Sequence, residues 1–288
     1  MPTSGYPRMM ANTSVRDLLR ANSGKEPRVN LIDLSADQTK WVKEKKAIKK
    51  LVKQHALLFD LQSRLWAEHK RSILICLQGM DTSGKDGTVK HVMTGLNPAG
   101  VDVDSFKAPT PAEKRHNFLW RFKESLPSPG TIGIFNRTYY EDVLIAKVHQ
   151  LAAETTIENR YGEINRFEQQ LARRGIVVLK IFLHISYDEQ RRRLLERLEN
   201  PDKHWKFSEN DINERAFWDD YTSAYDAALT RCDTAVAPWY IIPANNKWYR
   251  DWAVAQILIE TLEEMNPQYP RPKLKVKALE KRLLAPAG

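Results

Sequence analysis

The feature that most constrains this chain is a glycine-rich loop between an apolar run and a segment of helical character. Residues 73–78 (ILICLQ) are typical of a buried strand, and residues 79–87 (GMDTSGKDG) follow directly. Gly79, Gly84 and Lys85 match the phosphate-binding pattern G-x-x-x-x-G-K. In such a loop, backbone N–H groups and a helix N-terminus face a phosphate, and the lysine adds a full positive charge. The sequence therefore predicts a strand, a phosphate site and a helix in this order.

The last position of the loop departs from the standard pattern. Asp86 stands where a Ser or Thr hydroxyl usually ligates Mg²⁺, and a second carboxylate, Asp81, lies inside the loop. Two carboxylates beside a phosphate repel it unless a divalent cation lies between them, and carboxylate oxygens are ligands that Mg²⁺ prefers. We therefore expect one or two Mg²⁺ ions, with Mn²⁺ as the alternative metal, at Asp81 and Asp86. The other interpretation of Asp86 is a charge that complements the helix dipole. The remaining residues predicted to surround the phosphate are Gly79, Met80, Thr82, Ser83, Gly84, Gly87 and Thr88.

Short apolar runs alternate with amphipathic stretches after residue 72, and this alternation predicts an α/β fold. Strands are predicted at residues 73–78, 101–106, 131–136, 176–185 and 239–243. Helices are predicted at residues 36–69, after Lys85, and at 111–123, 140–149, 157–174, 186–198, 208–230 and 248–265. The expected architecture is a doubly wound parallel sheet with helices on both faces. In the first helix the predicted buried face comprises Trp41, Ile48, Leu51, Val52, His55, Leu58, Gln62 and Leu65. We expect residues 1–35 to be a peripheral tail, 36–270 one domain and 271–288 a second tail.

Composition narrows the cellular setting and the partners. Among 288 residues, 45 Lys and Arg stand against 36 Asp and Glu, giving a net charge of +9. This charge suits an anionic partner or substrate, and also an ordinary basic protein. The two cysteines, Cys76 and Cys232, leave no disulfide framework and favour a reducing compartment. No apolar run reaches the length of about 18 residues that a membrane span needs. We therefore expect a cytoplasmic protein without a membrane partner.

A second polar group follows the third predicted strand. Asn136 and Arg137 leave its carboxyl end, where ligands bind in doubly wound sheets, so both are expected to face Lys85. The Arg137 guanidinium offers a planar fork for phosphate oxygens. Glu141 and Asp142 begin the next predicted helix and can hold a metal ion or hydrogen-bond an acceptor. Simple capping of the helix N-terminus is the alternative for these two carboxylates.

A cationic helix and loop form a candidate lid over residues 188–215. Its cations are Arg191, Arg192, Arg193, Arg197, Lys203 and Lys206. Arg193 and Arg197 are four residues apart and share a helix face. Phosphate-transfer enzymes close such segments over a phosphate chain and exclude water. The alternative is an ordinary solvated surface of mixed charge.

Four separated motifs together resemble the second family of polyphosphate kinases, and they are most similar to its class III members. They are residues 79–87, 135–144 (FNRTYYEDVL), 201–207 (PDKHWKF) and 237–250 (APWYIIPANNKWYR). The resemblance spans residues 40–270 and implies a thymidylate-kinase-like P-loop kinase core with a helical lid. It also implies Mg²⁺-dependent transfer of the terminal phosphate of inorganic polyphosphate to nucleoside mono- and diphosphates, a reaction that we expect to be reversible. AMP and ADP are the implied acceptors for class III, GMP and GDP are further candidates, and the implied assembly is a homodimer or a homotetramer.

The resemblance also implies roles for individual residues. Its catalytic set is Asp81, Lys85, Asp86, Asn136 and Arg137, and its acceptor-nucleotide set is Arg137, Glu141 and Asp142. The implied polyphosphate and lid contacts are Arg191, Arg192, Arg193, Arg197, Lys203 and Lys206. Asn136 replaces an Asp that other classes carry, which favours class III and leaves the metal to Asp81 and Asp86, with Asp142 as a further candidate. Thr138 replaces the commoner Ser, a mild change.

Two other functions stay open on the sequence alone. One is an ATP-dependent nucleotide or small-molecule P-loop kinase, against which Asp86 argues. The other is a non-catalytic module that binds nucleic acid or another polyanion, which would need aromatic platforms beside a basic face. Trp239, Tyr240, Trp248 and Tyr249 lie in strand and helix patterns and are predicted core residues, so no nucleic-acid partner is expected. Cys76 lies inside the first predicted strand and is expected to pack there and not to act as a nucleophile.

Overall fold

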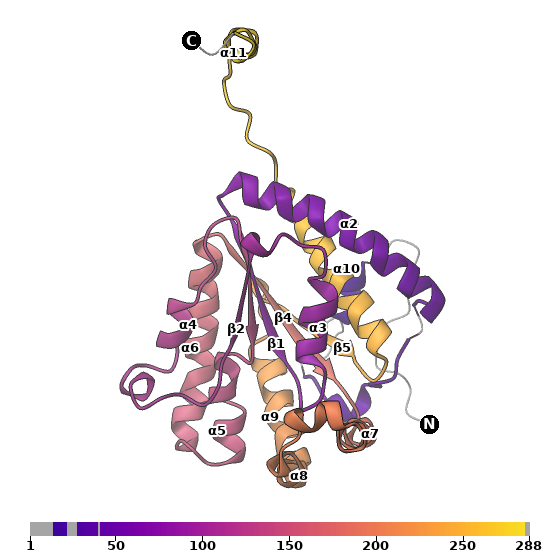
Figure 1. Cartoon of the computed structure of the whole chain (residues 1–288). Coiled ribbons are helices and arrows are strands. Elements are labelled where there is room, and N and C mark those ends of the chain that lie inside the picture. The colour runs from indigo at the N-terminus through magenta and orange to yellow at the C-terminus, as the bar shows by residue number, and fades with distance from the viewer. Residues whose placement is uncertain (1–13, 22–27, 40, 286–288) are drawn as a thin grey trace.

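The sheet contains five parallel strands, with the strand that precedes the phosphate loop at its centre (Figure 1). The computed structural model describes residues 14–21, 28–39 and 41–285. Its strands are β1 (Ser72–Gln78), β2 (Val101–Ser105), β3 (Ile132–Asn136), β4 (Ile176–His184) and β5 (Trp239–Pro243). They lie in the order β2-β3-β1-β4-β5, and each pair of neighbours is parallel. The five predicted strands and the parallel sheet are confirmed.

β1 is buried along its whole length because helices cover both faces of the sheet. Its register pairs Leu77 with Asn136 of β3, and Gln78 with Phe182 of β4. The loop that follows β1 therefore starts beside the ends of both neighbouring strands. This carboxyl edge of the sheet is where ligands bind in doubly wound folds.

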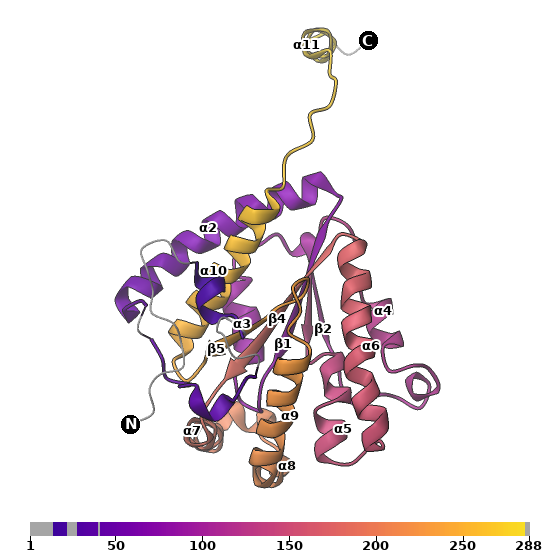
Figure 2. The same ribbon diagram turned by 180° about the vertical axis from the view of Figure 1, so that it is seen from behind.

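Two helical layers cover the sheet (Figures 1 and 2). One layer contains α1 (Val15–Leu19), α2 (Glu44–Glu68), α3 (Lys85–Val92) and α10 (Lys247–Met265). The other contains α4 (Trp120–Glu124), α5 (Ile145–Val148), α6 (Glu154–Arg173) and α9 (Trp218–Arg231). In the first layer α10 packs along α2 and against α3. The expectation of an α/β fold with helices on both faces is confirmed.

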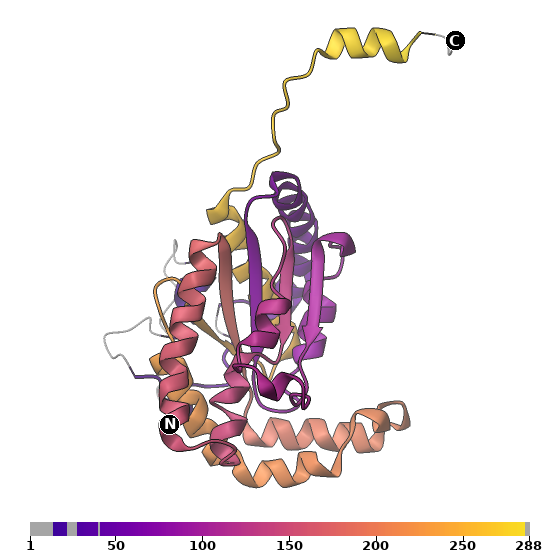
Figure 3. The same cartoon turned by 90° about the vertical axis from the view of Figure 1, so that its left-hand side faces the viewer.

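A helical hairpin projects at the carboxyl edge of the sheet (Figure 3). α7 (Tyr187–Glu199) forms one arm, and the turn η5 (Pro201–Lys206) joins it to α8 (Glu209–Glu214) and η6 (Arg215–Phe217), which lead into α9. Ser186 caps α7, because its hydroxyl accepts a hydrogen bond from the Glu189 N–H at 3.2 Å. The hairpin corresponds to the segment predicted as a lid.

The N-terminal segment is part of the core, which differs from the peripheral tail expected for residues 1–35. Val15, Leu18 and Leu19 of α1 are buried, and Leu31 of η1 (Leu31–Asp33) is buried as well. The Ala21 N–H donates to the Trp239 carbonyl oxygen at 2.9 Å, which ties the segment to β5. The few apolar side chains of this segment are enough to pack it against the core, although the segment is polar overall. Residues 1–13 and 22–27 of the expected tail lie outside the described residues.

The C-terminal segment leaves the domain after α10 (Figure 3). Residues 266–285 run outward to α11 (Val276–Leu283), which has no buried residue. Residues 286–288 lie outside the described part of the chain.

Several predicted helices have different boundaries or a different buried face. The helix expected over residues 36–69 is α2 and begins at Glu44, and two members of its predicted buried face, Ile48 and Val52, are 52% and 69% exposed. The helix carries two apolar stripes, and only the one that includes Leu58 and Leu65 faces α10 and the hydrophobic core. Residues 111–123 form only η3 (Glu113–Arg115) and the start of α4, and residues 140–149 divide into η4 (Tyr139–Asp142) and α5. A further turn, η2 (Pro98–Gly100), precedes β2.

The predicted aromatic and sulfur-containing core residues are confirmed. Trp239, Tyr240 and Tyr249 are buried, and Trp248 packs against the core. Cys76 is buried in β1, and burial raises the pKa of its thiol to about 12, so it does not act as a thiolate. Among the helices of the described residues, none has the length and apolar character needed to cross a membrane.

Candidate active site

The phosphate loop contains two glycines whose backbone and surroundings exclude a side chain. Gly79 (φ +152°) and Gly84 (φ +102°) adopt conformations that other residues rarely take. A Cβ at Gly79 would lie 2.7 Å from Ser83 Oγ, and one at Gly84 would lie 1.9 Å from Arg250 Nη1. Thr82 also has a positive φ of 65°. Non-glycine residues in this region cost energy and gather at functional sites, so the shape of the loop is maintained against local strain.

The other predicted loop residues divide between the cavity side and the core side. Thr82 and Gly87 line a cavity at the loop, and Met80 lines a second one. Ser83 and Thr88 are buried behind the loop. The Thr88 hydroxyl donates to the Gly84 carbonyl oxygen at 3.1 Å, which occupies it within the helix.

Lys85 begins α3 directly after the loop, and its ammonium is held by the loop itself. Nζ donates to the Gly79 carbonyl oxygen at 2.7 Å and to the Met80 carbonyl oxygen at 3.4 Å. Burial lowers the pKa of this ammonium, and the nearby Asp81 carboxylate opposes the shift. A desolvated positive charge beside a helix N-terminus interacts strongly with phosphate oxygens.

The end of β3 faces the phosphate loop, as predicted. Asn136 Nδ2 donates to Asp86 Oδ1 at 2.7 Å, and Arg137 Nη2 lies 3.4 Å from Asp81 Oδ1. Arg137 has a positive φ of 62°, which turns its backbone sharply at the end of the strand. Each loop carboxylate is thus matched by a donor from the neighbouring strand.

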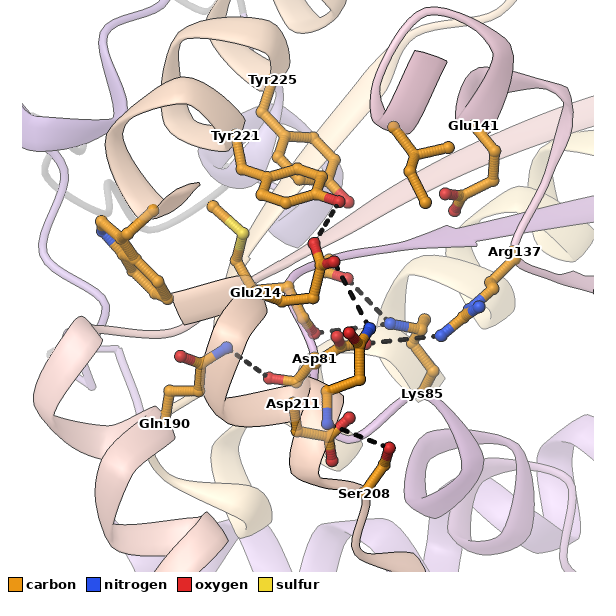
Figure 4. Close-up of a pocket in the computed structure, with 15 residues that line it drawn as sticks. Asp81, Lys85, Arg137, Glu141, Gln190, Ser208, Asp211, Glu214, Tyr221 and Tyr225 are labelled. Carbon is orange, nitrogen blue, oxygen red and sulfur yellow. Dashed lines mark hydrogen bonds and ion pairs between the residues drawn. The ribbon is translucent and has the colours of Figure 1, made fainter. Parts of the chain in front are cut away.

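Two cavities meet at this junction and share Asp81, Lys85, Arg137 and Asp211. We call the larger one the basic chamber. It measures about 550 Å³, and its walls are the loop together with Ser105, Phe106, Lys107, Asn136, Arg197 and Lys206. We call the smaller one the aromatic chamber (Figure 4). It measures about 180 Å³, and beyond the shared residues and the loop it is lined by Glu141, Ile145, Gln190, Ser208, Asn210, Glu214, Trp218, Tyr221 and Tyr225.

The two chambers differ in charge. Cations outnumber carboxylates in the basic chamber, whose charged residues are Lys85, Lys107, Arg137, Arg197 and Lys206 against Asp81, Asp86 and Asp211. The balance is reversed in the aromatic chamber, where Lys85 and Arg137 stand against Asp81, Glu141, Asp211 and Glu214. The basic chamber therefore suits a chain of phosphates. The aromatic chamber suits a ligand that is anionic only at the end next to Lys85 and Arg137.

The aromatic chamber is built on one face of α9. Trp218, Tyr221 and Tyr225 are three and seven residues apart, so they share that face. The Tyr221 hydroxyl donates to Glu214 Oε2 at 2.9 Å, as Figure 4 shows, and His149 Nε2 lies 2.9 Å from the same oxygen. These contacts fix the Glu214 carboxylate beside flat aromatic surfaces that can stack on a planar ring.

Glu141 lies in the aromatic chamber with its carboxyl group close to both cations of the junction. Burial raises the pKa of this carboxyl group, and the Arg137 and Lys85 charges act in the opposite direction. Burial by itself would lower the pKa of Arg137, but Glu141 and Asp81 outweigh it and the guanidinium stays charged.

Asp81 and Asp86 fit the ligand set of a divalent cation such as Mg²⁺. Both carboxylates line the basic chamber, and each makes a single side-chain contact among the described residues, so oxygen lone pairs stay available. In the same described residues no group of three or more His, Cys, Asp or Glu side chains forms a complete metal cage. Mg²⁺ suits such a site, because it keeps several waters and phosphate oxygens among its ligands.

The predicted lid cations do not act as one group. Arg197 and Lys206 line the basic chamber. Arg191 and Arg192 are exposed, are paired with acidic residues of their own helix, and line neither chamber. Lys203 is exposed in η5 and also lies outside both linings.

Arg193 differs most from its predicted position among the lid cations, because it is buried and does not face the chambers. Only 5% of its side chain is exposed, and its guanidinium donates to backbone carbonyl oxygens behind the phosphate loop. Its i,i+4 spacing with Arg197 indicated a shared cationic face. The difference arises because α7 lies against the loop along one edge of that face.

Glu141 and Asp142 are separated by the turn that carries them. They lie in η4, where consecutive residues point about 120° apart, so only one can face the chamber. Asp142 instead pairs with Arg160 at 3.6 Å, and the Arg160 guanidinium also donates to its carbonyl oxygen at 2.8 Å. The expected acceptor pair is therefore one chamber residue and one structural residue.

Several chamber residues were not predicted from the sequence. Lys107 follows β2 without any motif, and Asp211 and Glu214 lie in the short acidic helix α8, which also matches no motif. The spacing of Trp218, Tyr221 and Tyr225 was a usable signal for one helix face, although periodicity does not show whether such a face borders a cavity or the core.

Comparisons with known proteins agree with this geometry. The sequence model of the family Polyphosphate kinase 2 matches residues 41–270. The AMP/ADP-polyphosphate phosphotransferase of Meiothermus ruber is 48% identical over 227 residues, which cover 79% of this chain and 85% of that protein. The ADP-polyphosphate phosphotransferase of Rhodopseudomonas palustris is 44% identical, over 74% of this chain and 78% of that protein. The crystal structure of polyphosphate kinase 2 from Arthrobacter aurescens TC1 has a TM-score of 0.90 and 40% identity, over 94% of this chain and 97% of that one. The matched region contains the phosphate loop, the β3 motif and the hairpin, and the chain belongs to the polyphosphate kinase 2 family of polyphosphate-dependent nucleotide kinases.

Proposed function

We propose that this polyphosphate kinase 2 transfers the terminal phosphate of inorganic polyphosphate to both AMP and ADP, as class III members do. The observation that carries the proposal is the meeting of two chambers of different character at Lys85, Arg137, Asp81 and Asp211. The names of the relatives support both acceptors, since one is an AMP/ADP-polyphosphate phosphotransferase and another is a polyphosphate:AMP phosphotransferase from Acinetobacter johnsonii.

The basic chamber is the site that we assign to polyphosphate. Polyphosphate has no base or sugar to recognise, so its binding depends on repeated cations along a track. Lys107, Arg197 and Lys206 provide such cations on the walls away from the loop, and Lys85 and Arg137 provide them at the junction. The Lys206 ammonium also lies 4.8 Å from the Trp205 ring, which restricts its position.

The aromatic chamber is the site that we assign to the acceptor nucleotide. Trp218, Tyr221 and Tyr225 offer ring faces for the base, and the Asn210 amide offers a donor and an acceptor to its edge. The phosphates of the nucleotide would then lie at the junction, within reach of Lys85 and Arg137. GMP and GDP differ from AMP and ADP only at the base, so these chamber walls would determine the preference.

The proposed reaction is direct transfer at the junction. An oxygen of the terminal acceptor phosphate forms a bond to the last phosphorus of polyphosphate, and the bond from that phosphorus to the bridging oxygen breaks. The shortened polyphosphate leaves with the electron pair of that bond. Lys85 and Arg137 hold the two phosphate groups in line and offset their charge, which is most of what phosphoryl transfer requires.

Phosphotransferases of this family generally need a divalent metal, and we propose Mg²⁺ at Asp81 and Asp86. When bound there, Mg²⁺ would neutralise phosphate oxygens at the junction. Asn136 contributes by donating to Asp86 Oδ1, which fixes the carboxylate in orientation. The transfer breaks one phosphoanhydride bond, in polyphosphate, and forms another, in the nucleotide. We therefore expect it to be reversible.

A matrix of donors and acceptors tests the proposal. The protein with Mg²⁺ is given polyphosphate or ATP as donor and AMP, ADP, GMP or GDP as acceptor, and the products are separated by chromatography. ATP formed from AMP and polyphosphate supports both acceptor roles. ADP as the final product from AMP would contradict the assignment to class III. Transfer from ATP without transfer from polyphosphate would contradict the proposed donor.

The assignment of chambers has its own test in two variants. Lys107→Met should raise KM for polyphosphate about tenfold and leave KM for AMP unchanged, because it removes one cation from the donor track alone. Trp218→Leu should raise KM for AMP and leave KM for polyphosphate unchanged, because it removes a stacking surface. The opposite pattern of KM changes would mean that polyphosphate binds in the aromatic chamber and the nucleotide in the basic chamber.

A further inference from the structure

We propose that Arg193 is a positioning residue that fixes the phosphate loop from behind, together with Gln190. Arg193 lies in the middle of α7, a helix whose neighbouring arginines are exposed. Its side chain is only 5% exposed, although it faces no substrate chamber. The inference concerns how the loop is held and rests on the proposed function only for its kinetic readout.

Every nitrogen of the Arg193 guanidinium has a partner. Nη1 donates to the Thr82 and Ser83 carbonyl oxygens at 2.9 and 3.0 Å. Nη2 donates to the Ala244 and Asn245 carbonyl oxygens, at 2.6 and 3.0 Å, in the turn between β5 and α10. Nε donates to Glu189 Oε1 at 2.6 Å, which sets the plane of the fork. One side chain thus joins the loop, α7 and the end of β5.

Gln190 bonds the carbonyl oxygen that precedes the two bonded by Arg193. Its Nε2 donates to the Asp81 carbonyl oxygen at 3.2 Å, an interaction drawn in Figure 4. The carbonyl oxygens of residues 81, 82 and 83 therefore all accept hydrogen bonds from α7, from side chains three positions apart on one face. Gln190 Oε1 accepts in turn from Arg215 Nη1 at 2.7 Å, which links η6 on the other arm of the hairpin to the same set.

These contacts matter because a peptide unit is planar and its C=O and N–H point in opposite directions. Fixing three consecutive carbonyl oxygens on the α7 side fixes the directions of the N–H groups at their other ends. Arg193 also places its positive charge beside the Thr82 and Ser83 carbonyl oxygens, which polarises those two peptides and makes their N–H groups stronger donors. Thr82 keeps a positive φ within this set, and the bonds to its carbonyl oxygen help to hold that conformation.

The test compares Arg193→Met with a matched control, Arg71→Met. Arg71 also bonds one carboxylate and one backbone carbonyl oxygen, those of Glu68 and Met265, but it does so at the opposite end of β1. For Arg193→Met we expect kcat with saturating polyphosphate to fall about 100-fold, because the loop is displaced. KM for AMP should change less than kcat, since the aromatic chamber lies mostly outside the loop. Arg71→Met should keep both constants.

Hydrogen exchange provides a readout that does not depend on the reaction. The peptide spanning residues 79–88 should exchange faster in Arg193→Met than in the unchanged protein or in Arg71→Met. Arg193→Lys should resemble Arg193→Met, because an ammonium has three donors and no planar fork and cannot serve four carbonyl oxygens. Activity is measured at two temperatures below the melting point, since a loss caused by unfolding disappears on cooling.

Two results would overturn the proposal. One is normal exchange of residues 79–88 in Arg193→Met. The other is a kcat loss that disappears on cooling, which would assign Arg193 to general stability. If the unchanged protein and Arg71→Met show no polyphosphate transfer while exchange behaves as expected, the proposed function fails and the positioning role stands.

Discussion

Lys85 carries the charge on which the proposed transfer depends most, and its surroundings disfavour that charge. The ammonium is partly buried and bonded to two carbonyl oxygens of its own loop, where desolvation lowers its pKa. A group maintained in an unfavourable environment is typical of a functional site. Removing the Lys85 ammonium should therefore lower activity, whereas the stability of the fold should not fall.

Lys85→Met should abolish most of the activity without harming the fold. We expect kcat to fall by about 10²–10³-fold, the usual cost of removing one preorganised charge from a reacting group. The midpoint of thermal unfolding should be unchanged or higher, because the variant no longer buries an ammonium. Lys90→Met, at an exposed position of the same helix, is the control and should keep full activity. Unchanged activity in Lys85→Met would contradict the role of this residue.

The lowered pKa of Lys85 also predicts the alkaline side of the pH profile. The charged form binds phosphate, so activity should decline as the pH rises through a pKa that burial has lowered from 10.5. Stability changes in the other direction. Between the folded-state pKa and 10.5 the unfolded chain binds more protons, so the free energy of unfolding rises with pH relative to that of Lys85→Met. The measurement is kcat/KM against pH, with Lys85→Arg as the variant that cannot lose its proton. If kcat/KM declines at the same alkaline pH in the unchanged protein and in Lys85→Arg, the decline belongs to another titrating group.

Single residues also show where prediction from the sequence stops. The loop glycines, Lys85, Asn136 and Arg137 could be placed because strand ends meet at a known edge of the sheet. Arg193 and Asp142 could not be placed, because neighbouring side chains of a helix or turn point in different directions. The sequence does not show which of these directions faces the chambers. The chamber residues Lys107 and Asp211 belong to no motif at all.

At the scale of elements, η4 owes its position to a buried network beneath it. Lys180 of β4 and Glu168 of α6 are fully buried and form an ion pair at 2.7 Å. The Tyr139 and Tyr140 hydroxyls both donate to Glu168 Oε1 at 2.8 Å, and Lys180 also donates to the Cys232 carbonyl oxygen. Burial raises the pKa of both tyrosines well above its ordinary value, so they remain donors. The turn that bears Glu141 is thus fixed to two elements of the core.

This network predicts an asymmetric response to mutation. Lys180→Met should lower the free energy of unfolding by about 3–5 kcal/mol, because it leaves the Glu168 carboxylate buried without a partner charge. The double variant Lys180→Met with Glu168→Gln should recover part of that loss, because it removes the buried charge while the amide oxygen still accepts from the Tyr139 and Tyr140 hydroxyls. Arg64→Met, which breaks the exposed pair with Asp60, is the control and should cost less than about 1 kcal/mol. Urea unfolding measures all three, and a double variant no more stable than Lys180→Met would contradict the interpretation.

α2 shows why the type of an element is easier to predict than its orientation. Its apolar periodicity correctly predicted a long helix. Ile48 and Val52 nevertheless lie on a second stripe, away from the one that packs on α10. Both stripes satisfy the same spacing, and only the position of α10, far along the chain, decides which is covered. Four of the five strands were easier, because β1, β3, β4 and β5 are short apolar runs of the kind found in a sheet covered on both faces. β2 is an edge strand that alternates valine with aspartate and is largely exposed, so its alternation was the signal.

At the scale of the whole molecule, the two ends of the described chain contribute very differently. The N-terminal segment places Val15, Leu18 and Leu19 in the core, and its backbone N–H groups at Val15 and Arg16 donate to Glu260. The C-terminal segment contains α11, which buries nothing. The sequence predicted both as tails because both are polar overall.

Deletions at the two ends should therefore have opposite outcomes. Removing residues 1–21 should cost several kcal/mol, because burial of each large apolar side chain of α1 contributes about 1.5–3 kcal/mol. Removing residues 271–288 should leave both the unfolding midpoint and KM for polyphosphate unchanged. Thermal unfolding and steady-state kinetics measure these effects. A higher KM for polyphosphate after the C-terminal deletion would show that the basic segment takes part in donor binding.

The central place of β1 has a consequence for how the protein is made. On the ribosome β1 appears early, but its partners β3 and β4 follow only at residues 132–136 and 176–184. The groups that hold the phosphate loop from behind come later still, at Arg193, at the Ala244 and Asn245 carbonyl oxygens and at Arg250. Such non-local pairings form late in folding. A nascent chain therefore carries the phosphate-loop sequence long before it can bind phosphate, and competence arises only when synthesis has passed α10.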